Sequence, residues 1–417
     1  MKEMKDSGTN WLGIIPTEWN LQKINSLYSL RNSKVSDRDY PPLSVTMKGI
    51  VPQLENAAKT NAHDDRKLVR KGDFAINSRS DRRGSCGISD MDGSVSLINT
   101  VLKPNHEMNS KYYNWLFHTV QFADEFYANG HGIVNDLWTT TWQDMKRIIT
   151  PSPPLDEQQR IADFLDEKCG EIDSLTNDIQ TQITTLEEYK KSLITETVTK
   201  GLNPSIKTKS TGNKYWENIP VNWELSDIKY LFEIVKRIAG KEGYDILSVT
   251  QKGLKIKDIS KNEGQIAESY ANYQFVYPTD FVMNHMDLLT GWVDCSKYFG
   301  VTSPDYRVFR LRDKKNNLNY YKYVMQSCYM NKIFYSLGQG VSNLGRWRLQ
   351  TSAFNNFKIP VPPLDEQQQI ADYLDSKCSE IDTVIQTKKE QLDVLAEYKK
   401  SLIYEYVTGK KEVPGNE

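Results

Sequence analysis

The segment PPLDEQQRIADFLDEKCGEID begins at Pro153, and it returns almost unchanged as PPLDEQQQIADYLDSKCSEID beginning at Pro362. The two copies align without a gap, and 26 of the 42 positions in 153–194 match their counterparts in 362–403. Chance does not produce identity of this extent, so the chain carries an internal duplication. Its order is a globular block, the repeated segment, a second globular block and the repeated segment again.

The duplication extends into the blocks that precede the repeated segments. An Ile-Pro-x-x-Trp motif ends at Trp19 and again at Trp223, and LSVTMKG from Leu43 matches LSVTQKG from Leu247. DFAIN matches DFVMN, and FYANGHG matches FYSLGQG. The offset between the copies drifts from 204 to 209 residues, which places small insertions in the loops between shared elements.

Each repeated segment predicts a long amphipathic helix. Asp156 and Asp365 stand where an N-cap is expected, with Gln159 and Gln368 three residues on as a capping box. Gly201 and Gly409 are the predicted stops. Apolar residues recur every seven positions, which is typical of a coiled-coil seam; they are Leu165, Ile172, Ile179, Leu186 and Leu193 in the first copy and Leu374, Ile381, Leu395 and Leu402 in the second, where Lys388 takes one place. We expect the second apolar row of the seam at Leu175, Tyr189, Val384 and Tyr398.

Charge is divided along the duplication. The chain has 417 residues and a net charge of −1. Residues 1–154 and 203–363 contribute +2 and +8, whereas 155–202 and 364–417 contribute −6 and −5. The basic blocks favour a polyanionic partner, and the acidic segments favour a different one.

The remaining composition is that of a globular protein. No apolar run reaches membrane-spanning length and no apolar leader begins the chain, so we expect a cytoplasmic protein. Five cysteines without CxxC spacing argue against a zinc site or a disulfide framework, and Cys169 and Cys378 are expected to be packing residues. No metal site is expected.

These features predict an α+β fold in four parts. We expect globular domains at 1–153 and 203–362, a central spacer helix at 154–202, and a distal spacer helix with a C-terminal tail at 363–417. One amphipathic helix cannot bury its stripe alone, so the two helices are expected to pair with each other.

Two divergent blocks that each end in PPLDEQQ-IAD-LD-K--EID and a heptad helix resemble the specificity subunit of a type I restriction-modification system. The resemblance runs from Trp11 to about Val407. It implies two target-recognition domains that read an asymmetric, bipartite site on double-stranded DNA. The resemblance further implies that the two helices pair as an antiparallel coiled coil, which acts as a ruler between the half-sites. It also implies that the chain is not an enzyme and recruits two methyltransferase subunits and two restriction subunits. No cofactor is then expected on this chain, and S-adenosylmethionine is expected on the methyltransferase.

DNA-reading side chains are expected where the two copies diverge within a shared frame. After Asn77 the first copy has SRSDRR, where Arg79, Arg82 and Arg83 are candidates for phosphate or guanine contacts; an ordinary solvated loop is an equally open interpretation. In LGRWRL of the second copy, Arg346 and Arg348 are candidates on one face of a strand, with Trp347 expected in the core. Candidate contacts to the DNA backbone are Lys48 in the first copy and its counterpart Lys252 in the second. Lys255 and Lys257 are further candidates in the second copy only.

Two alternatives remain open from the sequence. Asp305, Asp313 and Lys315 fit the loose PD…DxK pattern of metal-dependent nucleases, although the first copy lacks it and short motifs often match by accident. A coiled-coil scaffold without DNA specificity is the other, but the separation of basic blocks from acidic helices speaks against it.

Overall fold

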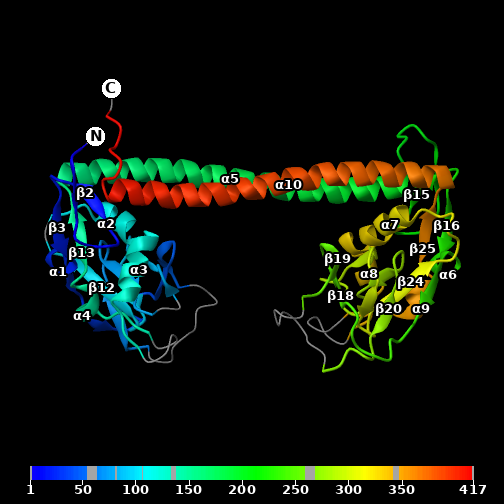
Figure 1. Ribbon diagram of the computed structural model, residues 1–417, viewed down its shortest axis with the longest axis horizontal. Helices are drawn as coiled ribbons and strands as arrows, with labels where there is room; N and C mark the ends of the chain where they lie inside the picture. Colours follow the sequence, from blue (N-terminus) through cyan, green and yellow to red (C-terminus); the bar gives the residue numbers. More distant parts are fainter. Residues whose placement is uncertain are drawn as a thin grey trace. The chain divides into compact units, whose positions relative to one another are not determined.

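The computed structural model describes residues 2–53, 63–79, 82–105, 107–132, 138–258, 268–340 and 347–415 (Figure 1). The chain divides into two compact units. Unit 1 comprises 1–180 and 389–417, and unit 2 comprises 181–388. Each unit therefore contains one globular domain and half of each long helix, so this division crosses the four segments expected from the sequence.

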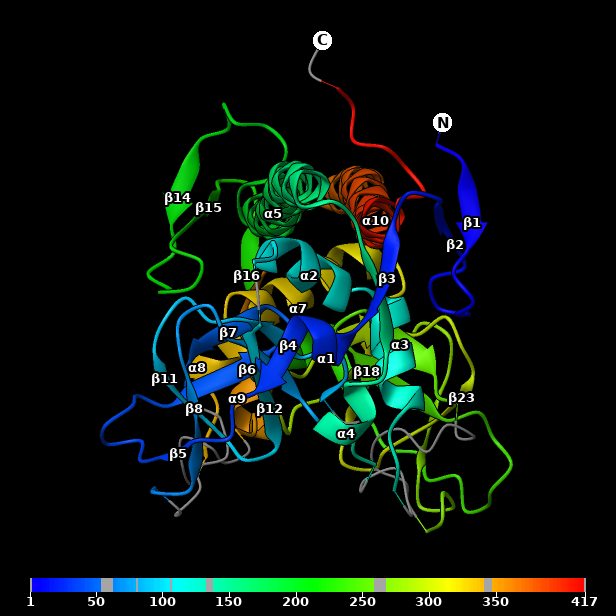
Figure 2. The same cartoon turned by 90° about the vertical axis from the view of Figure 1, so that its left-hand side faces the viewer.

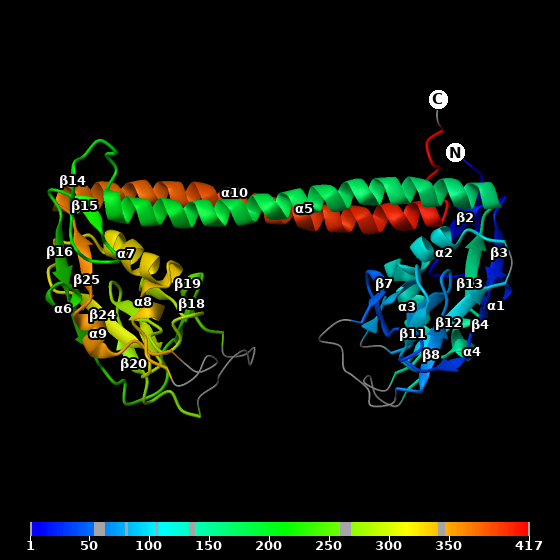
Figure 3. The ribbon, with the colours of Figure 1, turned by 180° about the vertical axis from the view of Figure 1, so that it is seen from behind.

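The two long helices are α5 (Leu155–Lys200) and α10 (Leu364–Val407), which run side by side within each unit (Figures 1, 2 and 3). The expected capping box is wrong. Helix α5 already begins at Leu155, where the Pro154 carbonyl accepts from the amides of Glu157 and Gln158. Asp156 therefore lies in the first turn, where its charge is favourable at the positive end of the helix.

The seven-residue row forms the seam, but its expected partner row is wrong. Leu165, Ile172, Ile179, Leu374, Ile381 and Leu402 are buried, and Leu186, Leu193 and Leu395 are half-buried. The side chains at the expected second row are exposed; they are Leu175, Tyr189, Val384 and Tyr398. The true second row lies four residues after the first; it includes Cys169, Ile183, Cys378, Ile385 and Tyr406, all of them buried. Cys169 and Cys378 thus pack in the seam as expected.

The helices are antiparallel in both units. In unit 1 the rings of Phe164 and Tyr406 lie 4.5 Å apart, and Lys399 pairs with Asp173 at 2.6 Å. In unit 2 the duplicated pair, Lys190 and Asp382, lies 2.7 Å apart, and Lys388 donates to Gln182 at 2.5 Å. Each half of the seam is therefore closed by the same ion pair.

The domain of unit 1 is built on an antiparallel four-stranded sheet with the order β10-β9-β12-β4. Its strands are β4 (Tyr28–Leu30), β9 (Phe74–Asn77), β10 (Cys86–Ile88) and β12 (Asn99–Pro104). The smaller sheets are formed by β1 (Met4–Asp6) with β2 (Ile14–Pro16), β3 (Asn20–Lys23) with β13 (Ile149–Ser152), β6 (Leu43–Thr46) with β7 (Gly49–Pro52), and β5 (Lys34–Val35), β8 (Arg66–Val69) and β11 (Gly93–Val95) together. The short helices are α1 (Ile24–Leu27), α2 (Ser110–Phe117), α3 (Val120–Ala128) and α4 (Trp142–Met145).

The domain of unit 2 repeats this plan with the sheet β22-β21-β24-β17. Its strands are β17 (Phe232–Val235), β21 (Phe281–Met283), β22 (Val293–Cys295) and β24 (Arg307–Leu311). The smaller sheets pair β14 (Thr208–Ser210) with β15 (Asn218–Pro220), β16 (Glu224–Asp227) with β25 (Lys358–Val361), β18 (Leu247–Thr250) with β19 (Gly253–Ile256), and β20 (Gln274–Val276) with β23 (Gly300–Thr302). The short helices are α6 (Ile228–Leu231), α7 (Leu318–Met330), α8 (Ile333–Ser336) and α9 (Thr351–Asn355).

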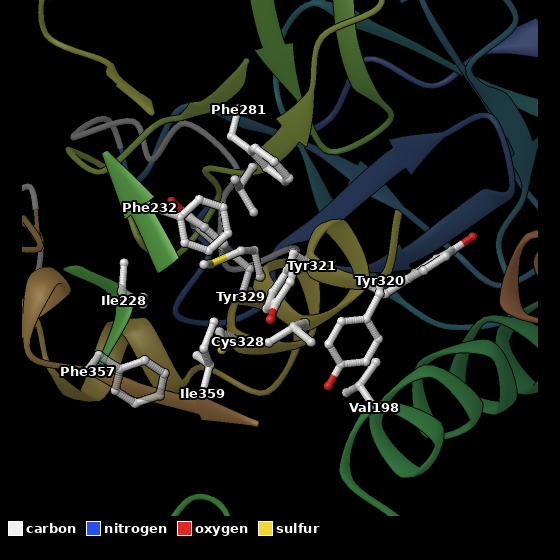
Figure 4. Close-up of a cluster of buried hydrophobic side chains, with 14 of the residues drawn as sticks. Val198, Ile228, Phe232, Phe281, Tyr320, Tyr321, Cys328, Tyr329, Phe357 and Ile359 are labelled. Carbon is white, nitrogen blue, oxygen red and sulfur yellow. The ribbon is translucent and has the colours of Figure 1, made fainter. Parts of the chain in front are cut away.

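Each core joins a domain to its half of the long helices. Helix α2 lies between the long helices and the sheet of unit 1 (Figure 3), and α7 has the same place in unit 2. Figure 4 shows the second core, where Phe232 and Phe281 from the sheet pack with Tyr321 of α7 and Val198 belongs to the same cluster. Within the part of the chain that the structure describes, no helix is long and apolar enough to cross a membrane.

Candidate nucleic-acid interface

The repeated motifs meet where each domain joins its long helix. The indole Nε1 of Trp19 donates to Glu157 in the first turn of α5 at 2.9 Å. Trp223 donates to Glu366 in the first turn of α10, also at 2.9 Å. Both indoles are fully buried. The Ile-Pro-x-x-Trp and PPLDEQQ motifs are therefore two halves of one junction.

The glutamines of PPLDEQQ complete the junction. Gln158 donates to the Pro153 carbonyl at 2.8 Å and accepts from the amide of Asn109, the N-cap of α2, at 3.0 Å. Gln367 does the same with Pro362 and with Asn317, the N-cap of α7, at 3.0 Å each. A buried side-chain amide satisfied on both sides fixes two helix starts against each other. The motif is thus structural, and its carboxylates need no catalytic role.

The candidate lysines lie on or beside two equivalent hairpins. Lys48 and Lys252 are exposed in the turns of β6–β7 and β18–β19. Both turns are closed by a threonine side chain that accepts from the lysine amide, at 3.1 Å and 3.2 Å. Lys255 is exposed on β19, and Lys257 follows it half-buried. An exposed ammonium on a rigid turn suits contact with a phosphate.

The three candidate arginines of unit 1 lie in the segment that follows β9, but their surroundings differ. Arg79, Arg82 and Arg83 are all exposed. The guanidinium of Arg83 forms an ion pair with Asp124 and lies 4.8 Å from the ring centre of Tyr127, which anchors it to α3. Arg79 pairs through its backbone with Thr139. Of the three, Arg79 is the one held on a strand-like backbone.

In unit 2 the candidate arginines follow the FYSLGQG loop. Arg348 is exposed, and its backbone pairs with Gln339. Arg346 lies outside the described residues. Trp347 is half-buried, with its ring 5.0 Å from that of Tyr335. The Trp138 ring stacks on the ring of Tyr127 at 5.4 Å. Both tryptophans pack on a domain helix, and Trp347 lies at the edge of the core and not inside it as expected.

A cleft with a volume of about 640 Å³ lies in unit 2. Its walls come from the β18–β19 hairpin, the segment before β20, the turn after β21 and the segment before β24. Polar side chains predominate; they include Lys255, Lys257, Tyr270, Tyr273, Asn284, Asp287, Asp305 and Tyr306. Except for the two lysines and Asp305, sequence reasoning missed these residues, because they come from separate segments and share no motif.

A buried cation beneath Arg348 was also missed. The Arg307 guanidinium donates to the Leu349 carbonyl at 3.0 Å and lies 4.5 Å from the ring centre of Phe354. Burial lowers the pKa of Arg307 to about 10. Burial and the guanidinium groups of Arg307 and Arg348 lower the pKa of His285 to about 4. His285 is therefore neutral at pH 7.

The nuclease alternative is wrong on geometric grounds. Asp305 precedes β24 and Asp313 follows it, so the five residues of the strand, at about 3.3 Å each, hold the two carboxylates far too far apart to share a metal ion. Asp313 accepts from the amide of Lys315 at 2.9 Å and thereby forms a turn. The described ranges contain no cluster of three His, Cys, Asp or Glu side chains that could hold a metal.

Comparison with known proteins agrees with this architecture. The family model for the type I restriction modification DNA specificity domain matches twice, over 16–185 and 220–394. The type I restriction enzyme MjaVIII specificity subunit of Methanocaldococcus jannaschii is 26% identical over 321 residues, which cover 72% of this chain and 70% of that protein. The putative MjaX specificity subunit of the same organism is 26% identical over 287 residues, covering 64% and 60%.

Two solved structures share the fold. A chain from a study of complex assembly and conformational transition in the type I R-M system has a TM-score of 0.70 at 14% identity, covering 95% of this chain and 99% of that one. The HsdS subunit from Thermoanaerobacter tengcongensis has a TM-score of 0.51 at 14% identity, covering 95% and 98%. Because the family model matches both halves and most of the sequence, the chain belongs to the type I restriction-modification DNA specificity family, with two copies of the specificity domain.

Proposed function

We propose that this chain selects an asymmetric, bipartite sequence on double-stranded DNA, with one half-site read by each domain and the gap set by the paired helices. One observation carries the proposal. The two domains share sheet order, hairpins and helix junctions, but they present different side chains after β9 and β21. A shared frame with divergent exposed groups suits equivalent docking on two different sequences.

The chain itself is proposed to be non-catalytic and to recruit its enzymes. Two methyltransferase subunits would carry S-adenosylmethionine and flip the target base, and two restriction subunits would complete the assembly. The exposed apolar row of the long helices supports a docking role. Leu175 matches Val384, and Tyr189 matches Tyr398, so each unit offers an identical partner a similar surface.

A scaffold without DNA specificity is the second candidate. The proposal is favoured over it because the exposed lysines recur at the same turn of both domains, at Lys48 and Lys252. Salt dependence separates the two ideas. A complex that loses all binding to mixed duplex DNA at moderate salt supports the scaffold.

The proposal is tested by mapping methylated bases in a methylation-deficient cell that expresses this chain with its methyltransferase subunit. We expect a split motif with a fixed gap. Exchanging residues 20–150 for those of a relative should then alter one half of the motif only. If the complex copurifies but methylates no base, the proposal fails, and only DNA binding without site selection or a scaffold role would remain.

A further inference from the structure

The two domains share a backbone crossing beside the loop that follows β9 and β21. In unit 1 the Asn77 side chain accepts from the amide of Arg79 at 3.0 Å, and in unit 2 the Asn284 side chain accepts from the amide of Met286 at 3.2 Å. Arg79 and Met286 therefore occupy the same position of the same turn.

The opposite segment is equivalent as well. Thr139 exchanges two backbone hydrogen bonds with His131, and Arg348 exchanges two with Gln339, all at 3.0 Å. One residue later, the Thr140 amide donates to the Ser78 carbonyl at 2.9 Å, and the Leu349 amide donates to the His285 carbonyl at 2.9 Å. Thr139 and Arg348 are thus structural counterparts.

The two positions face each other within each domain. Arg79 pairs through its backbone with Thr139. In unit 2 the Nε of Arg348 lies 2.7 Å from the sulfur of Met286. The facing pair is therefore arginine and threonine in one domain, and methionine and arginine in the other. Within this facing pair each domain has one exposed guanidinium, and the two domains contribute it from opposite segments.

The surroundings of the crossing differ accordingly. In unit 1 Arg79 lines a small hollow with Arg83, Tyr127 and Trp138. In unit 2 Met286 lines the large cleft, and Arg307 holds the backbone directly after Arg348 through the Leu349 carbonyl. Arg307 is thus a positioning residue for the segment that carries Arg348.

We propose that Arg79 and Arg348 are equivalent DNA-contacting groups, so that each domain directs one guanidinium at its half-site from opposite sides of the same crossing. This inference rests on the proposed function. A guanidinium binds phosphate oxygens and the O6 and N7 acceptors of guanine with the same donor geometry. Moving the guanidinium to the facing segment changes its approach to the DNA while the frame stays the same.

The test uses the complex of the full chain with its methyltransferase subunits, bound to a duplex that carries the mapped site. R79M and R348T replace each arginine by the residue that the other domain has at that position. We expect each to weaken binding about tenfold, within the range of about 5- to 150-fold for one specific contact. The transfer variants R79M/T139R and M286R/R348T restore a guanidinium that approaches the DNA from the facing segment, so they should recover only part of the loss. Arg310→Met, an exposed arginine on β24 paired with Glu233, is the control and should bind normally.

The outcomes separate the possible causes. Loss confined to one base of the half-site identifies a base-edge contact, whereas equal loss on all sequences with a shallower salt dependence identifies a phosphate contact; both support the proposal. Wild-type affinity for both R79M and R348T overturns it. A wild-type complex that shows no preference for any split site refutes the proposed function instead. Far-ultraviolet circular dichroism of each variant excludes misfolding as the cause of a loss.

Discussion

Trp223 and Glu366 illustrate how two short motifs act as one group. The indole is fully buried, and its Nε1 donates to the carboxylate at 2.9 Å. A hydrogen bond to a charged group contributes about 1.5–3 kcal/mol, more than a neutral one. Trp223→Phe leaves the carboxylate without this donor, so we expect a loss of about 2 kcal/mol in the free energy of unfolding of unit 2, measured by urea titration.

Glu366→Gln is the matched control for this junction. The amide retains an oxygen that accepts from the indole, so its loss should be smaller than that of Trp223→Phe. An equal or larger loss in the glutamine variant would show that charge, not the hydrogen bond, holds the junction.

His285 gives the protein a pH dependence. Its pKa is lowered from the ordinary 6.5 to about 4 by burial and by Arg307 and Arg348. The unfolded chain therefore binds one more proton between about pH 6.5 and pH 4, so stability falls as the pH drops through that range and the effect is complete below it. The ring is partly exposed, and solvent screening reduces the effect of the pKa shift. We therefore expect the free energy of unfolding to fall by about 1–2 kcal/mol.

The measurement compares urea unfolding of the wild type and His285→Asn at pH 7, 6, 5 and 4. The other titrating groups are common to both proteins, so the difference between the two curves isolates His285. Parallel curves across this range would contradict the assignment of a neutral, partly buried imidazole.

At individual sites the sequence predicted residue types better than partners. The recurrence of Trp19 and Trp223 marked them as important, but their bond to a glutamate more than a hundred residues away depends on the tertiary fold. The arginines of the diverged loop became candidates because they differ between the copies. That Arg79 faces Thr139 could not be found, because strand pairing across a loop has no local pattern.

The long helices show where pattern reasoning fails within an element. Their length and their pairing follow from the duplicated apolar period, whereas the antiparallel direction was expected from the family resemblance. The second seam row was misplaced because a helix places the neighbours of each seam residue three and four positions away, and hydrophobicity favoured the wrong one. Lys190 and Lys399 occupy the true row and reach carboxylates of the facing helix, so polar residues line part of the seam.

Neighbouring residues of α10 test the corrected seam. Ile385 is 7% exposed and Val384 is 44% exposed. Ile385→Ala removes buried methyl groups and leaves a cavity, so we expect the free energy of unfolding to fall by about 2–4 kcal/mol. Val384→Ala should cost less than about 0.5 kcal/mol. Thermal unfolding followed at 222 nm distinguishes the two, and the reverse order would restore the seam expected from the sequence.

For the molecule as a whole, the duplication explains both symmetry and specificity. The repeated junctions, seam ion pairs and sheet orders make the two units alike, while the diverged loops make them different. The α+β class, the two long helices and the family could all be predicted, because duplication leaves a signal in the sequence itself. The shape of the cleft in unit 2 could not, since its walls come from separate segments.

The spacer proposal can be tested by lengthening both helices together. Lys388 contacts Gln182, so an insertion after 182 in α5 faces an insertion after 388 in α10. Duplicating the heptads 176–182 and 382–388 therefore lengthens both helices at the same level of the coiled coil and keeps the seam in register. Seven residues at 1.5 Å per residue add about 10 Å, the length of about three base pairs. We expect the mapped motif to keep both half-sites and to widen its gap by two or three base pairs.

A heptad added to α5 alone is the control for this experiment. It leaves seven residues without facing partners, so the seam can no longer match on both sides of the insertion, and stability and methylation should both fall. If the doubly lengthened chain methylates a motif with altered half-sites and an unchanged gap, the helices do not set the spacing. The recognition of the gap would then have to reside in the domains themselves.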